Sequence, residues 1–143
     1  MANRYCHHPF IIFGIGVLAF VGWTVASIPT ARTAYAQGST YADADKAYKN
    51  KDYKTAHGLW LGFAETGNQT SYFNLGRMYV FGHGVTIDMI EAYKWFKLAD
   101  QAGLPQAKSG LNMVGRVMTP PDIIEGDRRV ERWYDQHPRT RRE

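Results

Sequence analysis

Cysteine is almost absent from this sequence. The single cysteine, Cys6, comes before an apolar run near the N-terminus, so the chain beyond that run has no thiol. Without thiols that part can form no disulfide scaffold and carry out no thiol chemistry. Cys6 also lies on the wrong side of the apolar run to be the lipidated residue of a lipoprotein leader. The following domain must therefore be held together by its apolar core, which is feasible for about 100 residues.

Charge of one sign is not in large excess either. Arg4 and Arg32 account for two of the 17 basic residues, which leaves 15 lysines and arginines against 13 acids in residues 37–143. The net charge of this segment is near +2. Such a balance does not indicate nucleic-acid binding.

A long apolar run occurs once, at Ile11–Ile28, and it spans 18 residues. Arg4 precedes it, and Ala34-Tyr35-Ala36 after it has the small residues of an A-x-A cleavage site. We predict that residues 1–36 are a secretory signal peptide and that the mature chain begins at Gln37. A retained membrane anchor at 11–28 is the alternative, because the run reaches the threshold of about 18 residues for a transmembrane helix. Both interpretations predict export of the folded part to the periplasm or beyond.

The remaining chain has a helical pattern of apolar residues that repeats. Apolar residues at i, i+3, i+4 and i+7 mark one packing face between Asp52 and Gly67, and a similar face recurs 36 residues later between Asp88 and Gly103. The repetition predicts an all-α fold of about three antiparallel helix pairs in residues 37–137. The two faces are formed by Ala56, Leu59, Trp60 and Phe63 and by Ala92, Trp95, Phe96 and Ala99.

Small residues and helix caps have defined places in this pattern. Gly76 and Ala92 are predicted where two helices approach closely. Gly82 and Gly84 are predicted where the connection between two helices needs positive φ. Asp88 is predicted to cap the next helix, with Glu91 completing a capping box.

The final predicted helix has a strongly marked start. Thr119 is placed as the N-cap, Pro120 as the first helical residue and Asp122 as the capping-box acid. We predict that this helix is the second of the third pair and closes the stack with one apolar and one charged side. The basic segment at 138–143 is predicted to be a solvated tail.

The segment "LGRMYVFGHGVTIDMIEAYKWFKLADQAG" resembles the Sel-one-like repeat family of tetratricopeptide-like proteins, in the exported bacterial form. The resemblance implies a right-handed α-solenoid whose concave surface holds proteins or peptides, and it does not imply an enzyme. Family members linked to β-lactams have paired cysteines that this chain lacks, so that activity is not carried over. The matching residues are Leu75, Gly76, Met78, Tyr79, Gly82, Gly84, Val85, Asp88, Ala92, Trp95 and Ala99.

Other kinds of site find little support in the sequence. The Gly-His-Gly sequence around His83 lacks the lysine and third glycine of nucleotide-binding loops. His57, His83 and His137 form no zinc-ligand pattern, and we expect His83 to be a solvent-exposed loop residue. Asp43 and Asp45 fit the first turn of a helix better than a calcium loop. We therefore predict no cofactor, no metal and no catalytic residue.

The candidate partner-binding residues are polar side chains on the first helices of the pairs, which line the concave face of such solenoids. They are Asn74, Arg77, Lys108 and Arg116, and they could bind an acidic peptide or a chain-terminal carboxylate. We predict a monomeric, non-catalytic adaptor or regulatory module in the bacterial envelope. The alternatives are an envelope enzyme or small-ligand protein acting on cell-wall fragments, and a membrane-tethered scaffold.

Overall fold

The computed structural model describes residues 38–141, which form six α-helices and one short 3₁₀ helix. The predicted all-α class is confirmed. The predicted signal peptide or anchor lies outside the described residues, and within them no helix combines the length and apolarity needed to cross a membrane. The elements are α2 (Tyr41–Lys49), α3 (Tyr53–Ala64), α4 (Gln69–Phe81), α5 (Met89–Gln101), α6 (Ala107–Gly115), α7 (Pro120–Gln136) and η1 (Pro138–Thr140).

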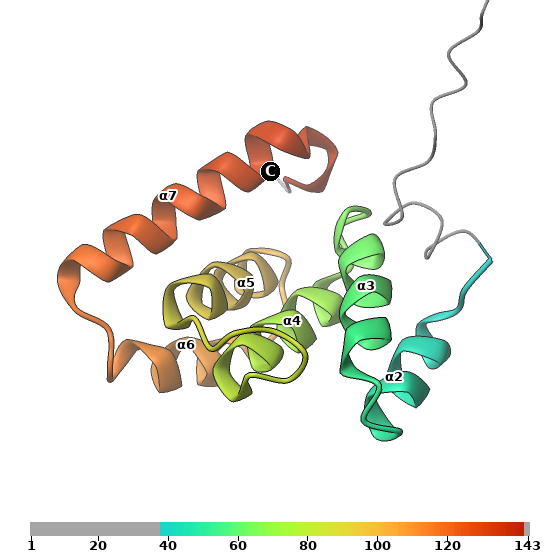
Figure 1. The fold of residues 1–143 in the computed structure, drawn as a ribbon. Coiled ribbons are helices and arrows are strands. Elements are labelled where there is room, and N and C mark those ends of the chain that lie inside the picture. Colours follow the sequence, from blue (N-terminus) through green and yellow to red (C-terminus); the bar gives the residue numbers. More distant parts are fainter. Residues whose placement is uncertain (1–37, 142–143) are drawn as a thin grey trace, which may run out of the picture.

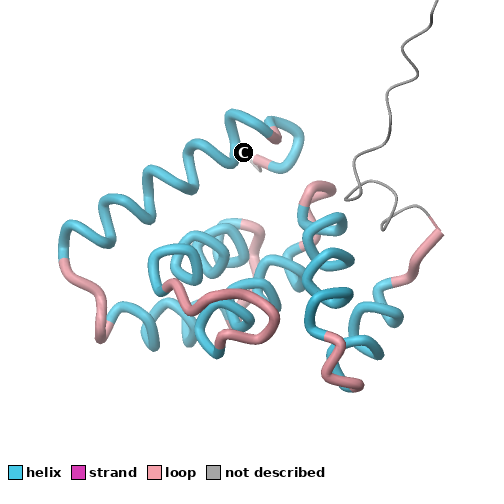
Figure 2. The backbone as a smooth tube through the Cα atoms, in the orientation of Figure 1, coloured by secondary structure: helices cyan, strands magenta, loops and turns pink. Residues whose placement is uncertain are grey.

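Successive helices pack against one another from α2 to α6 (Figure 1). In addition, α4 contacts α6, so both helices lie against α5 and against each other. The turns between helices are short, and the longest is the α4–α5 connector at 82–88 (Figure 2). Short turns make neighbouring helices antiparallel, which puts α4 and α6 in the same direction.

The 36-residue period is visible in the helix ends. Asp52 and Asp88 are the N-caps of α3 and α5, and each accepts a hydrogen bond from the backbone N–H three residues on, at 3.2 and 2.9 Å. Gly67 and Gly103 follow the same two helices, and both have positive φ, 83° and 88°. The repeated sequence pattern therefore corresponds to repeated local structure.

The interactions of the Glu91 side chain differ from those predicted. Asp88 caps α5 as expected, but Glu91 does not complete a capping box. Its carboxylate instead forms ion pairs with Lys94 of α5 and Arg129 of α7. The reason is the presence of α7, which brings a guanidinium group close to the first turn of α5.

Close helix packing at small residues is confirmed. A Cβ atom at Gly76 of α4 would lie 2.7 Å from the ring of Phe96, and one at Gly110 of α6 would lie 2.6 Å from it. Ala92 is completely buried. The Phe96 ring of α5 thus fills the space that two glycines leave open, and it fixes how closely α4 and α6 approach α5.

The last helix does not pair with α6 as predicted. It packs on α5 instead, so α5 lies between α6 and α7 (Figure 1). Its predicted start is confirmed, because Thr119 and Asp122 form a capping box. Its apolar stripe is also confirmed at Gly126, Val130 and Trp133, which are buried.

The different position of α7 has a steric reason. Gly126 allows α7 to meet α5 closely, since a Cβ atom there would lie 2.4 Å from the ring of Tyr93. On α6 the residue 36 positions after Gly76 is Asn112, whose side chain is exposed. The exposed face of α6 therefore lacks, at this place, the small residue through which Gly76 lets α4 approach α5 closely.

The C-terminal segment 138–143 was predicted to be a solvated tail. The structure describes residues 138–141 of it, and these residues pack on the folded domain instead. Pro138–Thr140 form η1, which contacts α7. Thr140 is buried and lies beside Gly67, in the turn between α3 and α4. Arg141 pairs with Glu131 and covers a tyrosine ring of α7. The folded domain therefore extends beyond the predicted boundary at residue 137.

Candidate functional site

An apolar hollow of about 220 Å³ opens between α4 and α6. Its floor is the buried ring of Phe96, which packs at 5.4 Å between ring centroids against Phe73 of α4. Large apolar side chains also reach solvent at its rim, since Phe81 and Met113 are each 51% exposed. The lining residues of this α4–α6 hollow are Phe73, Arg77, Val80, Phe81, Phe96, Ser109, Gly110 and Met113.

The hollow follows from the repeat geometry. Helices α4 and α6 lie side by side on α5, and the glycines at their contact with Phe96 leave little bulk between them. Residues 73, 77, 80 and 81 share one face of α4, and residues 109, 110 and 113 share one face of α6. The hollow is thus built on two rigid helices rather than on a loop.

The structure separates the four predicted partner-binding residues. Arg77 is exposed at the rim of the hollow, with its guanidinium 5.8 Å from the ring of Tyr48. Arg116 is exposed at the end of α6, three residues after Met113 and therefore on the same helix face. Arg77 therefore lines the hollow, and Arg116 lies about one turn beyond its rim residue Met113.

The other two predicted residues are placed elsewhere. Asn74 is half-buried and donates a hydrogen bond of 2.6 Å to the hydroxyl of Tyr41, so it joins α4 to α2. Lys108 lines a separate shallow hollow at the α5–α6 turn, together with Asp100. The prediction that all four form one binding face is therefore not supported by their positions.

Sequence reasoning missed the apolar part of the site. Phe73, Val80, Phe81 and Met113 do not belong to the packing faces that the repeat pattern identifies. The available signal was a second group of apolar residues on α4, at 73, 80 and 81, which interrupts what should be a polar face. Such a group on a helix that is already packed indicates a further contact surface.

The two helices that form the hollow have cationic residues and no acidic ones. The sequence contains no aspartate or glutamate from residue 66 to 87 or from 101 to 121. Arg77, Lys108 and Arg116 form no ion pair with any residue between 38 and 141. The hollow therefore has positive charge beside it that the described chain does not neutralise.

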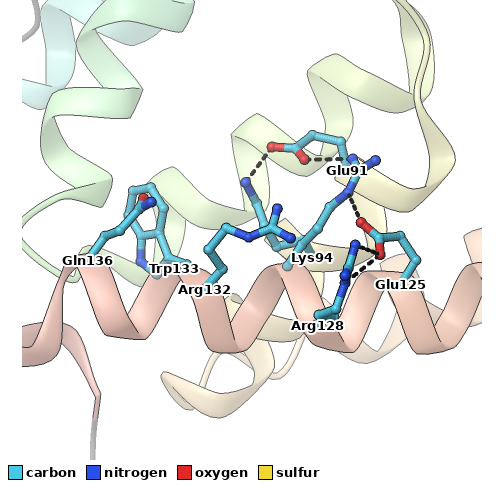
Figure 3. A pocket seen from close by; sticks show the side chains of 8 residues that line it. Glu91, Lys94, Glu125, Arg128, Arg132, Trp133 and Gln136 are labelled. Atoms are coloured by element: carbon cyan, nitrogen blue, oxygen red, sulfur yellow. Dashed lines mark hydrogen bonds and ion pairs between the residues drawn. The ribbon is translucent and has the colours of Figure 1, made fainter.

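A second hollow, of about 290 Å³, lies on the opposite side of α5, against α7 (Figure 3). Its centre is Arg129, which donates to Asp88 at 3.1 Å, to Glu91 at 3.0 Å and to Glu125 at 3.2 Å. Lys94 is buried there with its ammonium 3.9 Å from the ring of Trp95. The lining residues of this α5–α7 hollow are Glu91, Lys94, Glu125, Arg128, Arg129, Arg132, Trp133 and Gln136.

The electrostatics of the α5–α7 hollow are those of a structural network. Burial alone would raise the pKa of Asp88, but the backbone N–H of Glu91 and the guanidinium of Arg129 outweigh burial and lower it. Burial likewise opposes the charge of Arg129, and hydrogen bonds to its carboxylate partners reverse that effect and raise its pKa. The charges at the centre of this hollow therefore satisfy one another and attach α7 to α5.

The Gly-His-Gly connector is held against the first helix pair. Gly82 and Gly84 have positive φ as predicted, 67° and 73°. His83 is not the exposed loop residue expected, because its ring stacks on Tyr53 at 4.4 Å and its Nδ1 hydrogen-bonds with the hydroxyl of Tyr48 at 2.8 Å. Within residues 38–141 no three metal-binding side chains come together.

Comparison of the chain with family models, curated proteins and solved structures finds no match.

Proposed function

We propose that this protein is a non-catalytic module that binds a peptide segment of a partner protein in the α4–α6 hollow. The observation that carries the proposal is a solvent-open apolar recess, with a buried aromatic floor and half-exposed Phe81 and Met113 at its rim. Exposed apolar groups gathered around a concave surface mark binding sites. We expect the protein to act as a monomeric adaptor or regulator.

A binding role is favoured over catalysis by the chemistry of the lining. Arg77 is the only lining side chain of the α4–α6 hollow that carries a charge, and no acid–base pair or nucleophile–base pair is present among its lining residues. An enzyme acting on cell-wall fragments would need several convergent titratable groups. A side-chain-sized apolar recess is instead suited to holding an anchor residue of a peptide.

We further propose that the domain is a right-handed α-solenoid of the Sel-one-like kind and that the cell exports it. The supporting observations are the 36-residue recurrence of the capping aspartates and of the positive-φ glycines that follow α3 and α5. In such a solenoid α4 and α6 are first helices, so the α4–α6 hollow belongs to the concave face. Export rests on the sequence of residues 1–36, and the site of action would be the periplasm or the extracellular space.

The test is selection of binding peptides from a displayed random library, with two tryptophan variants as a matched pair. Ser109→Trp places an indole in the hollow, whereas Asn112→Trp places the same ring at an exposed position of α6 that does not line the hollow. Peptides selected on the unmodified protein should bind Asn112→Trp and fail to bind Ser109→Trp. Circular dichroism must show that both variants keep the same thermal stability.

Two results would contradict the proposal. One is a library that yields no peptide whose binding Ser109→Trp blocks. The other is turnover of an envelope substrate that survives Ser109→Trp, which would indicate an enzyme acting elsewhere on the molecule.

A further inference from the structure

We infer that the segment held in the α4–α6 hollow is acidic and inserts one large apolar side chain. This inference rests on the proposed function, because it specifies the ligand of the same site. It combines two independent features of the hollow: its size and lining, and the sign of the charge beside it.

The size of the hollow favours a single anchor. Pockets for drug-sized molecules usually measure about 300–1,000 Å³, and this hollow, at about 220 Å³, is smaller. Its lining is aromatic and aliphatic apart from Arg77 and Ser109. Met113 at the rim has an adaptable side chain that can close over an inserted group. A phenylalanine, leucine or methionine side chain fits these properties.

The positive charge beside the hollow favours a ligand with acidic residues next to that anchor. Arg77 lines the hollow, Arg116 follows Met113 by three residues at the end of α6, and neither helix contains an acid. An arginine can donate two hydrogen bonds to one carboxylate, which gives geometry as well as attraction. Carboxylates next to the apolar anchor would therefore meet Arg77 at the hollow and Arg116 at the end of α6.

Charge also argues against the chain's own N-terminal segment as the occupant. Residues 1–37 contain two arginines and no aspartate or glutamate. Their positive charge would be repelled by Arg77 and Arg116. A partner of opposite charge is the better match.

The experiment measures fluorescence anisotropy of three labelled heptapeptides with the full chain. The first has a central phenylalanine, two glutamates on each side and a serine at each end. The second replaces every glutamate by glutamine, and the third replaces the phenylalanine by alanine. We expect the glutamate peptide to bind about fivefold to tenfold more tightly than the glutamine peptide at low salt, from two exposed ion pairs. Loss of the phenylalanine should weaken binding at least about tenfold.

Two double variants test which cations cause the preference for the glutamate peptide. Arg77→Gln with Arg116→Gln should remove the difference between the glutamate and glutamine peptides and keep the requirement for phenylalanine. Lys54→Gln with Arg139→Gln makes the same change in net charge at exposed residues outside the hollow. This control should leave both preferences unchanged. About 1 M salt should reduce the glutamate preference in the unmodified protein, because the ion pairs are exposed.

The outcomes separate this inference from the proposed function. If the glutamate peptide does not bind at millimolar concentration, or binds no better than its glutamine counterpart, the ligand is not acidic and the inference is wrong. The proposed function survives that result as long as library peptides bind in a way that Ser109→Trp blocks. Self-association that Ser109→Trp abolishes would assign the hollow to a second copy of this chain and would also overturn the inference.

Discussion

The N-cap of α5 offers the sharpest test of how this fold is held together, because Asp88 has two separable roles. Its Oδ1 caps the helix at 2.9 Å, and its Oδ2 accepts from Arg129 of α7 at 3.1 Å. Removing a cap of this kind costs about 1 kcal/mol. The ion pair is partly exposed, at 26% for Arg129 and 38% for Asp88, so it contributes about 0.5 kcal/mol. Asp88→Ala should therefore lower the free energy of unfolding by about 1.5 kcal/mol.

The chain contains a matched control for the cap alone. Asp52, 36 residues earlier, caps α3 in the same manner and makes no ion pair with any residue between 38 and 141. Asp52→Ala should cost about 1 kcal/mol. Asp88→Asn keeps the capping oxygen and loses the charge, so it should cost only about 0.5 kcal/mol.

Urea unfolding followed by circular dichroism measures these differences, and about 1.5 kcal/mol corresponds to a midpoint shift of about 1 M. Because Asp88 has a lowered pKa in the folded state, its charge stabilises the protein above the ordinary value of 3.8. That stability is lost as the pH falls through the lowered folded pKa, so the advantage over Asp88→Asn should disappear in acid. If Asp88→Ala costs no more than Asp52→Ala at neutral pH, the assigned role of Arg129 is refuted.

Three further predictions concern packing, alkaline pH and export. Gly76→Ala should destabilise the protein by about 1–3 kcal/mol in the same urea assay, because the added Cβ atom would clash with Phe96. Gly115→Ala is the control: its Cβ atom would meet no atom within 4 Å, so the substitution should be neutral or stabilising. Burial raises the pKa of Tyr93 to about 12, so stability should fall as the pH rises from 10 toward 12, and Tyr93→Phe should reduce that fall. Intact mass of the exported protein should show a chain that begins at Gln37, and a mass that includes the leader would indicate a retained anchor.

The parts of the fold that the sequence predicted depend on local rules. Asp88 and Thr119 precede helices because their side chains can satisfy free backbone N–H groups. Gly82 is followed by a turn because its positive φ costs a glycine little. Gly76 was identified because the repeat pattern placed it opposite an aromatic residue on the next helix. Each of these features involves residues near in sequence or related by the 36-residue period.

The position of α7 could not be predicted in the same way. The apolar stripe of α7 specifies that one side is buried but not which helix buries it. The choice depends on Gly126 fitting Tyr93 and on Arg129 reaching the first turn of α5, contacts between residues more than 30 positions apart. His83 was misjudged for a similar reason, because the aromatic ring on which it stacks belongs to a different helix pair.

The sequence pointed to two cations, Arg77 and Arg116, but not to the apolar hollow. Arg77 and Arg116 were identified because polar residues on a first helix stand out against its packing face. The hollow depends on three helices meeting at Phe96, which no single helical pattern encodes. Asn74 was predicted to bind a partner because its amide lies on the polar face of its helix. In the structure this amide donates a hydrogen bond to the hydroxyl of Tyr41.

The arrangement of charge around α5 supports the proposal that a ligand binds in the α4–α6 hollow rather than in the larger α5–α7 hollow. On the α7 side, Arg129 already has three carboxylate partners within 3.2 Å, so a ligand there would have to compete with ion pairs that the fold has formed. On the α4–α6 side, Arg77 and Arg116 have no such partners in residues 38–141. A ligand carboxylate there gains an ion pair without displacing one that the described residues already form. Arg132 also lines the α5–α7 hollow without an ion pair in residues 38–141, so the comparison applies to Arg129. A ligand carboxylate gains less free energy at Arg129, whose partners it must displace, than beside Arg77 and Arg116.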